Sequence, residues 1–146
     1  MRKPILLLLA AILTISASVT RADDDHAYTQ GPVVVVNFVR TQPGMFEEYM
    51  RYLGSTYKHL MDEYKKQGII TDYSVYQARP RDSQDADLIL TVTYKNMAAL
   101  DDVQARTDPT AKQAFGSLAK AASASADRTK LRVEVGSEMI RQLILK

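Results

Sequence analysis

The sequence predicts a single α+β domain in which two helices cover one face of a four-stranded antiparallel sheet. Three observations support this fold class. A β-branched run at 33–39 is followed by a long amphipathic helix, two alternating segments form a hairpin, and a second helical region precedes a last strand. The order of elements, β-α-β-β-α-β, is that of the ferredoxin-like arrangement.

The first 22 residues have the composition of a secretory signal peptide. Arg2 and Lys3 precede an apolar run at 5–13, and small residues lead to Ala22. The run is shorter than the roughly 20 apolar residues that cross a bilayer, so we expect cleavage after Ala22 rather than a retained membrane anchor. The absence of cysteine excludes a lipoprotein anchor. The protein is therefore expected to be exported, either to a periplasm or out of the cell.

The composition of the mature chain limits its partners and chemistry. Loss of residues 1–22 leaves 16 basic and 17 acidic side chains, a net charge of about −1, which argues against a nucleic-acid-binding surface. Without cysteine there are no disulfides, thiolate metal sites or cysteine nucleophiles. We expect a flexible N-terminal arm at 23–31 followed by one domain at 32–146. His26, beside three aspartates in that arm, is interpreted as part of a solvated tail rather than a metal-binding terminus.

The first two elements have the clearest signals. The strand at 33–39 is apolar on both faces, which is typical of a central strand covered on both sides. A helix is expected to have Pro43 at its first position, acidic residues in its first turns, basic residues in its last turn and Gly68 just past its end. At about 100° per residue, its apolar side chains form one stripe. The stripe consists of Phe46, Met50, Leu53, Tyr57, Leu60, Met61 and Tyr64.

Residues 69–79 and 88–95 alternate between apolar and polar side chains and are separated by a polar loop. They are expected to form an antiparallel hairpin. Asn96 can then cap a short helix from 97 to about 105.

The last third of the chain predicts a second main helix and a final strand. Asp108 and Pro109 combine a cap with a proline at the first helical position. The Ser/Ala stretch at 121–126 is interpreted as a fraying helix end or a linker. The final strand covers 131–145, with a bulge or turn at Gly136.

The apolar character of the first strand also predicts a partner. Both helices lie on one face of a ferredoxin-like sheet, whereas residues 33–39 are apolar on both faces. A second copy of the same sheet is the simplest cover for the open face. We therefore expect a homodimer.

On these segments the chain resembles the dimeric α/β-barrel superfamily. Its members include antibiotic-biosynthesis-type monooxygenases, haem-degrading monooxygenases, stress-responsive barrel proteins and NIPSNAP-like proteins. The resemblance covers residues 33–145 and is carried by VVVVNFVR, TQPGMFEEYM, the hairpin and KNMAALDDVQARTDPTAKQAF. It implies a ferredoxin-like fold that dimerises through its sheet. It implies no single activity, because the architecture hosts enzymes and non-enzymes alike.

The resemblance does not extend to a haem site. Haem-degrading relatives place a ligand histidine on the second helix and an asparagine in the first strand. Asn37 lies in the first strand here, but no histidine follows His59. No cofactor is therefore expected. The chain also has no G-x-S-x-G, Walker A, G-x-G-x-x-G or H-E-x-x-H pattern.

One pair of residues has the spacing of a general base. His59 and Glu63 are four apart on the long helix, so the carboxylate could orient the imidazole. Both residues lie away from the apolar stripe. An ordinary pair on the helix surface is the preferred interpretation.

Tyrosines and one asparagine are the candidate ligand-binding residues. Asn37 is a polar amide within an apolar strand, so it must be hydrogen-bonded or functional. Several tyrosines facing one cleft could line a pocket for a flat or amphipathic molecule. Aromatic core filling, and pairing of Asn37 with Thr91, Thr93 or Ser74, would account for the same residues without a ligand. Strand parity alone does not say which face Asn37 occupies. The candidate set is Asn37, Tyr57, Tyr64, Tyr73 and Tyr94.

Two functions are consistent with this sequence. The first is an exported homodimer that binds a small apolar or aromatic molecule or acts in envelope stress. The second is a cofactor-independent monooxygenase or isomerase that acts on a phenolic or polyketide-like substrate, with Asn37 and tyrosines as hydrogen-bonding groups.

Overall fold

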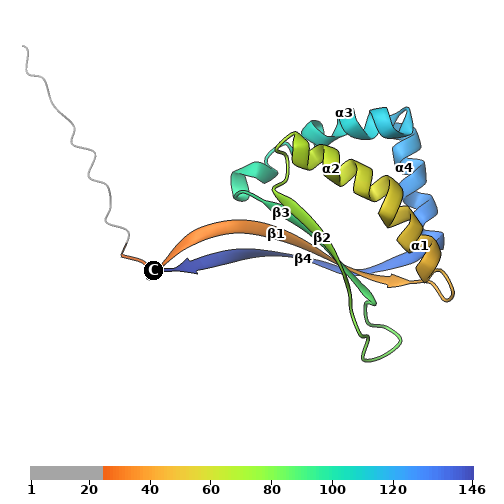
Figure 1. The fold of residues 1–146 in the computed structure, drawn as a ribbon, viewed down its shortest axis with the longest axis horizontal. Coiled ribbons are helices and arrows are strands. Elements are labelled where there is room, and N and C mark those ends of the chain that lie inside the picture. The colour runs from red at the N-terminus through yellow and green to blue at the C-terminus, as the bar shows by residue number, and fades with distance from the viewer. Residues whose placement is uncertain (1–24) are drawn as a thin grey trace, which may run out of the picture.

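The computed structural model describes residues 25–146, and the predicted signal peptide lies outside them. One sheet forms a layer, and the helices lie together on one side of it (Figure 1). Within the described residues no helix is long and apolar enough to cross a membrane.

Four strands make up the sheet. They are β1 (Tyr28–Thr41), β2 (Asp72–Gln77), β3 (Leu88–Tyr94) and β4 (Arg132–Leu145). The spatial order is β2-β3-β1-β4, and every neighbouring pair is antiparallel. This topology, with helices on one face, confirms the predicted ferredoxin-like fold.

The first helical region consists of three consecutive segments. Helix α1 (Phe46–Tyr52) runs through a π-helical segment η1 (Leu53–Tyr57) into α2 (Lys58–Lys66). Two 3₁₀ turns, η2 (Met97–Leu100) and η3 (Arg128–Lys130), flank the second helical region. That region contains α3 (Val103–Phe115) and α4 (Leu118–Asp127).

Several predicted boundaries were wrong. Strand β1 begins at Tyr28, so residues 28–30, expected in the flexible arm, are paired with the end of β4. The first helix begins at Phe46 rather than Pro43, because Pro43 and Gly44 form the turn that leaves the sheet and Gly44 has a φ of +77°. Gly68 ends α2 in the left-handed region, as predicted.

The predicted start of the second main helix was also wrong. Pro109 lies inside α3, which begins six residues earlier at Val103. The Ser/Ala stretch at 121–126 belongs to α4, whose start is capped by the Ser117 hydroxyl. Asn96 caps the following turn as predicted, by accepting a hydrogen bond from the Ala99 amide at 3.0 Å.

The π-helical segment corrects the predicted apolar stripe. Tyr49 is 2% exposed, although the stripe of a straight helix assigned that region to Phe46 and Met50. The Ser55 hydroxyl donates to the Arg51 carbonyl at 2.7 Å, a bond that competes with the helical ladder. One inserted residue rotates the helix before it by about 100° relative to the helix after it. The first half of the helix therefore presents Tyr49 to the sheet.

Strand register assigns the two faces of the sheet. Asn37 lies opposite Leu90 of β3 and Ser137 of β4, and Leu90 belongs to the core beneath the helices. Asn37 therefore faces the helices. Its neighbour Val36 lies opposite Thr91, so Thr91 points to the other face and does not satisfy the Asn37 amide.

The core under the helices has two parts. One cluster contains Leu53, Leu88 and Leu90, where the first helical region covers the start of β3. The other joins α2 to the following turn through Leu60, Ile69 and neighbouring side chains. The candidate pocket described below adjoins the first cluster.

The sheet face opposite the helices carries several large apolar side chains among polar ones. Phe38 and Ile89 lie on it half-buried, and Ile140 and Tyr76 are 50% and 54% exposed. Strands β1 and β4 extend beyond the other strands as a two-stranded ribbon that ends near the C-terminus (Figure 1). That ribbon carries further exposed apolar side chains, namely Leu143, Ile144 and Leu145.

Candidate functional site

A pocket of about 270 Å³ lies between the first helical region and the sheet, and we call it the Tyr57 pocket. Val39, Leu90 and Val92 of the sheet contribute apolar walls. Tyrosine, asparagine and charged side chains supply the polar groups. The complete lining is Asn37, Val39, Tyr49, Tyr52, Tyr57, Met61, Leu90, Val92, Arg128, Arg132 and Glu134.

Local structure explains how the polar side chains reach this pocket. The π-helical segment ends at Tyr57 and joins the two helices whose other residues cover the sheet. Arg132 and Glu134 begin β4, just before a register shift in its pairing with β1. Strand alternation directs both side chains to the same face as Asn37. Such irregular segments re-aim side chains and are frequent at functional sites.

Two polar atoms of this site are buried without a hydrogen-bond partner. They are the Tyr57 hydroxyl and the Arg132 Nε, the two such side-chain atoms found within residues 25–146. A buried polar group without a partner costs about 1–3 kcal/mol of stability, so native proteins retain few of them. Both atoms belong to residues that line one pocket.

The surrounding charges and phenols set the electrostatics of the site. Arg132 Nη1 donates to Glu134 Oε2 at 3.1 Å, and the Arg128 guanidinium lies 5.1 Å from the centre of the Tyr52 ring. Burial raises the pKa of Tyr57, and nearby tyrosines add to the effect. Burial also raises the pKa of Tyr49, although Arg132 and Arg128 oppose this. Both phenols are therefore neutral at physiological pH.

The structure brings together only two of the five predicted ligand-binding residues. Asn37 and Tyr57 line the pocket. Tyr64 is a buried member of the second core cluster, and Tyr94 packs against that cluster. These two tyrosines therefore fill the core, which is the alternative that needs no ligand.

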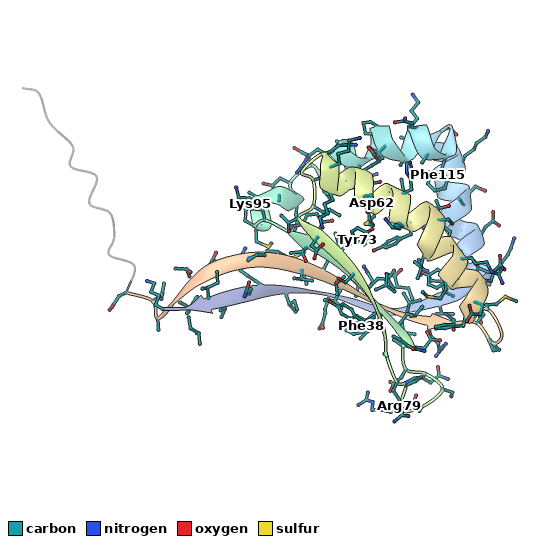
Figure 2. The ribbon with its side chains drawn as sticks, in the orientation of Figure 1. Phe38, Asp62, Tyr73, Arg79, Lys95 and Phe115 are labelled. Atoms are coloured by element: carbon teal, nitrogen blue, oxygen red, sulfur yellow. The ribbon has the colours of Figure 1, made fainter. Side chains whose placement is uncertain are left out.

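Tyr73, the fifth predicted residue, makes a T-shaped ring contact with Tyr57, with the ring centres 6.0 Å apart. Its hydroxyl donates to the Asp62 carboxylate at 2.6 Å on the surface between α2 and β2 (Figure 2). Lys58 pairs with the same carboxylate. Tyr73 therefore supports Tyr57 from the side and directs its polar end toward solvent.

Sequence reasoning missed the charged part of the pocket. Arg128, Arg132 and Glu134 lie in a segment that reads as a linker followed by an ordinary strand. The basic residues Arg128, Lys130 and Arg132 were the available signal, and such residues are common on protein surfaces. Tyr49 and Tyr52 were missed because their positions depend on the π-helical segment.

The other candidate groups lie apart from the pocket. His59 is exposed on α2, and Glu63 pairs with Lys66 at 3.5 Å rather than orienting the imidazole. His26 stacks on Tyr28, with ring centres 5.5 Å apart. The described residues contain no cluster of three or more His, Cys, Asp or Glu placed to hold a metal ion.

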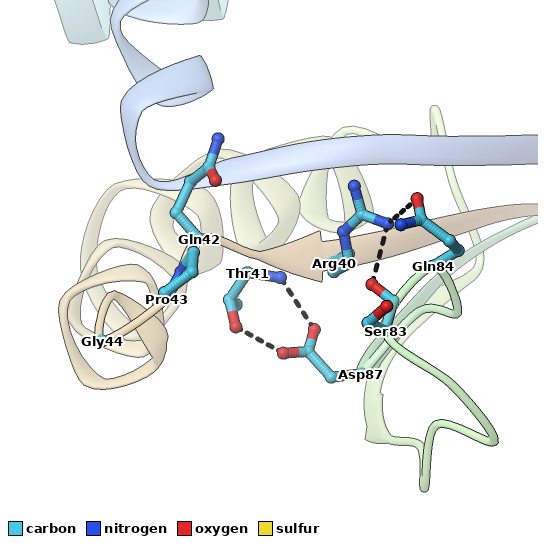
Figure 3. Close-up of a pocket in the computed structure, with 8 residues that line it drawn as sticks. All are labelled: Arg40, Thr41, Gln42, Pro43, Gly44, Ser83, Gln84 and Asp87. Atoms are coloured by element: carbon cyan, nitrogen blue, oxygen red, sulfur yellow. Dashed lines mark hydrogen bonds between the residues drawn. The ribbon is translucent and has the colours of Figure 1, made fainter.

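A second hollow, of about 480 Å³, lies where β1 ends beside the hairpin loop (Figure 3). Its polar groups bond to one another. The Thr41 amide and hydroxyl both donate to the Asp87 carboxylate, and Arg40 donates to the Ser83 carbonyl at 3.1 Å and to Gln84 at 2.9 Å. These bonds fix the loop to the strand, so we assign the hollow a structural role.

Comparisons with known proteins bear on the fold. No protein-family model matches the chain, and no curated protein matches it. The crystal structure of HapK from Hahella chejuensis is similar, with a TM-score of 0.53 and 8% sequence identity over 75% of this chain and 91% of that chain. A second structure, described as "Putative Chlorite dismutase TA0507", has a TM-score of 0.44 and 13% identity. It covers 77% of this chain, which spans 44% of that protein. The similarity to HapK shows that this chain has a ferredoxin-like fold shared with a protein of nearly unrelated sequence.

Proposed function

We propose that this protein binds a small aromatic or apolar molecule in the Tyr57 pocket. The observation that carries the proposal is the buried Tyr57 hydroxyl, which lacks a partner within the described residues and belongs to a residue lining an open pocket. A ligand that accepts a hydrogen bond from this hydroxyl would remove its energetic cost.

The walls of the pocket support the same proposal. Ligand sites typically combine apolar surfaces with a few polar groups that orient the ligand. Here Leu90 and Val92 form part of the apolar wall, while Asn37 and Tyr57 provide an amide and a phenol. The volume of about 270 Å³ is at the lower limit of ordinary ligand sites, which favours a molecule with one or two rings.

A catalytic role is the second candidate. The same amide and phenol could stabilise an enolate or phenolate of a phenolic or polyketide-like substrate in a cofactor-independent oxygenase or isomerase. Proton abstraction also requires a base. The carboxylate that lines the pocket belongs to Glu134, which Arg132 already binds at 3.1 Å. Binding without catalysis therefore ranks first.

A ligand screen followed by thermal unfolding tests this function. Wild type, Asn37→Ala and Tyr57→Phe would be melted with a library of aromatic compounds. Tyr76→Phe is the matched control, because Tyr76 lies on the sheet face opposite the pocket and is not part of the pocket lining. We expect stabilising compounds to act equally on wild type and Tyr76→Phe and less on the two pocket variants. If a compound stabilised all four proteins equally, or if no compound stabilised any of them, the proposal would be rejected. A structural or protein-binding role, for example in envelope stress, would then be favoured.

We further propose that the protein is exported and forms a homodimer through the open sheet face. The apolar side chains of that face support the second part. Ile140 lies opposite Val34, and both belong to the face without helices. A second copy covers such a face with the same residues on both sides.

A further inference from the structure

We propose that the Tyr57 pocket selects molecules that carry a carboxylate on an aromatic ring, with Arg132 as the group that binds the carboxylate. This inference rests on the proposed function and adds the chemical class of the ligand. Its basis is the position and hydrogen bonding of the Arg132 guanidinium.

Arg132 is a cation held largely out of water. Its side chain is 18% exposed, and its Nε has no hydrogen-bond partner among residues 25–146. Glu134 occupies Nη1 on one edge of the guanidinium. The opposite edge contains Nε, which together with the adjacent Nη2 can donate two parallel N–H groups, the arrangement that matches the two oxygens of a carboxylate.

The charge of the lining favours an anion. Arg128 and Arg132 contribute two positive charges, and Glu134 contributes one negative charge. A carboxylate in the pocket would balance the remaining positive charge and satisfy the Nε. Charge-assisted hydrogen bonds of this kind are about twice as strong as bonds between neutral groups.

The other residues that line the pocket favour a particular kind of group bearing the carboxylate. Tyr57 offers a neutral phenol, whose hydroxyl can donate to an oxygen of the same anion or to a ring substituent. Val39, Leu90 and Val92 are suited to an apolar ring. A phosphate would bring more charged oxygens than the unpartnered donors of this pocket can bind, so the planar carboxylate is the better match.

Calorimetry on the wild-type protein with two matched probes tests the inference. Benzoate and benzamide have nearly the same shape, and only benzoate carries a charge. We expect benzoate to bind at least about tenfold more tightly at pH 7, because it alone accepts charge-assisted bonds from Arg132. Equal affinity for the two probes would overturn the inference and leave the proposed function standing. If neither probe binds, both the inference and the proposed function fail for aromatic ligands of this size.

Substitutions then test the residue assignment. Arg132→Lys keeps the positive charge and removes the Nε edge, so benzoate affinity should fall by roughly tenfold to a hundredfold while that for benzamide changes little. Arg51→Lys is the control, because Arg51 is 71% exposed on α1. Tyr57→Phe provides a second variant if Arg132→Lys does not fold, and it should weaken benzoate binding severalfold. Unchanged benzoate affinity in either folded pocket variant would contradict the assignment of that residue.

Discussion

Replacement of Tyr57 by phenylalanine should stabilise the ligand-free protein. The phenol oxygen of Tyr57 is buried and unpartnered within the described structure, whereas its ring makes a T-shaped contact with the Tyr73 ring. Phenylalanine keeps the ring and this contact. It removes only the polar atom whose burial is unfavourable.

The expected gain follows from the cost of that buried hydroxyl. An unsatisfied buried polar group costs about 1–3 kcal/mol, and part of this is offset by the small void that the missing oxygen leaves. We therefore expect the free energy of unfolding to rise by about 1 kcal/mol. For a domain of this size, such a change raises the melting temperature by about 3–5 °C.

Calorimetric melting of the ligand-free protein measures this change, and Tyr73→Phe is the matched control. The Tyr73 hydroxyl donates to Asp62 at 2.6 Å, so its removal should not raise the melting temperature. A fall of more than about 2 °C for Tyr57→Phe would show that the Tyr57 hydroxyl has a partner in the folded protein, and would refute the reasoning. A gain in stability together with a loss of ligand binding would identify the hydroxyl as a group kept for function.

Three further outcomes are expected. Ile140→Glu should convert the proposed homodimer to a folded monomer in light scattering, because Ile140 lies on the open sheet face and is 50% exposed in the single chain. Leu118→Glu, on α4, is the control and should leave the dimer intact. A wild-type monomer at micromolar concentration would contradict the proposal. Intact-mass analysis of the exported protein should give a chain that begins at Asp23, whereas a membrane-bound species retaining residues 1–22 would contradict cleavage. Lys58 and Tyr73 bind Asp62 and lower its pKa from 3.8, so the stability due to this carboxylate is present above that pH and is lost as the pH falls through the lower folded value. Urea unfolding of Asp62→Asn should therefore show a smaller loss of stability below about pH 4 than wild type. The same loss in both proteins would contradict this assignment.

Local chemistry was sufficient to predict the order of elements. The alternation at 88–95 and the β-branched run at 33–39 correspond to β3 and β1, and Gly68 and Asn96 end and begin helical segments as expected. These features depend on a few neighbouring residues. Pro109 misled the prediction because it reads locally as the first residue of a helix, whereas it lies inside α3, which already begins at Val103.

The candidate pocket was predicted only in part, since it depends on residues far apart in the chain. Asn37 and Tyr57 could be selected as unusual side chains, but Arg132 becomes notable only when its Nε is found buried without a partner. It reaches the pocket because β4 pairs with β1 and places position 132 opposite Thr41. No local pattern indicates that neighbour.

The sequence by itself determined the α+β class, the β-α-β-β-α-β order and the apolar character of both faces of β1, because these follow from side-chain periodicity and from residues that begin or end helices. Only the tertiary structure decided that Asn37 faces the helices, that Tyr64 and Tyr94 fill the core, and that an arginine completes the pocket. The physical reason is that alternation along a strand separates two faces without saying which one the helices cover. Strand register and helix packing, which join distant residues, make that choice.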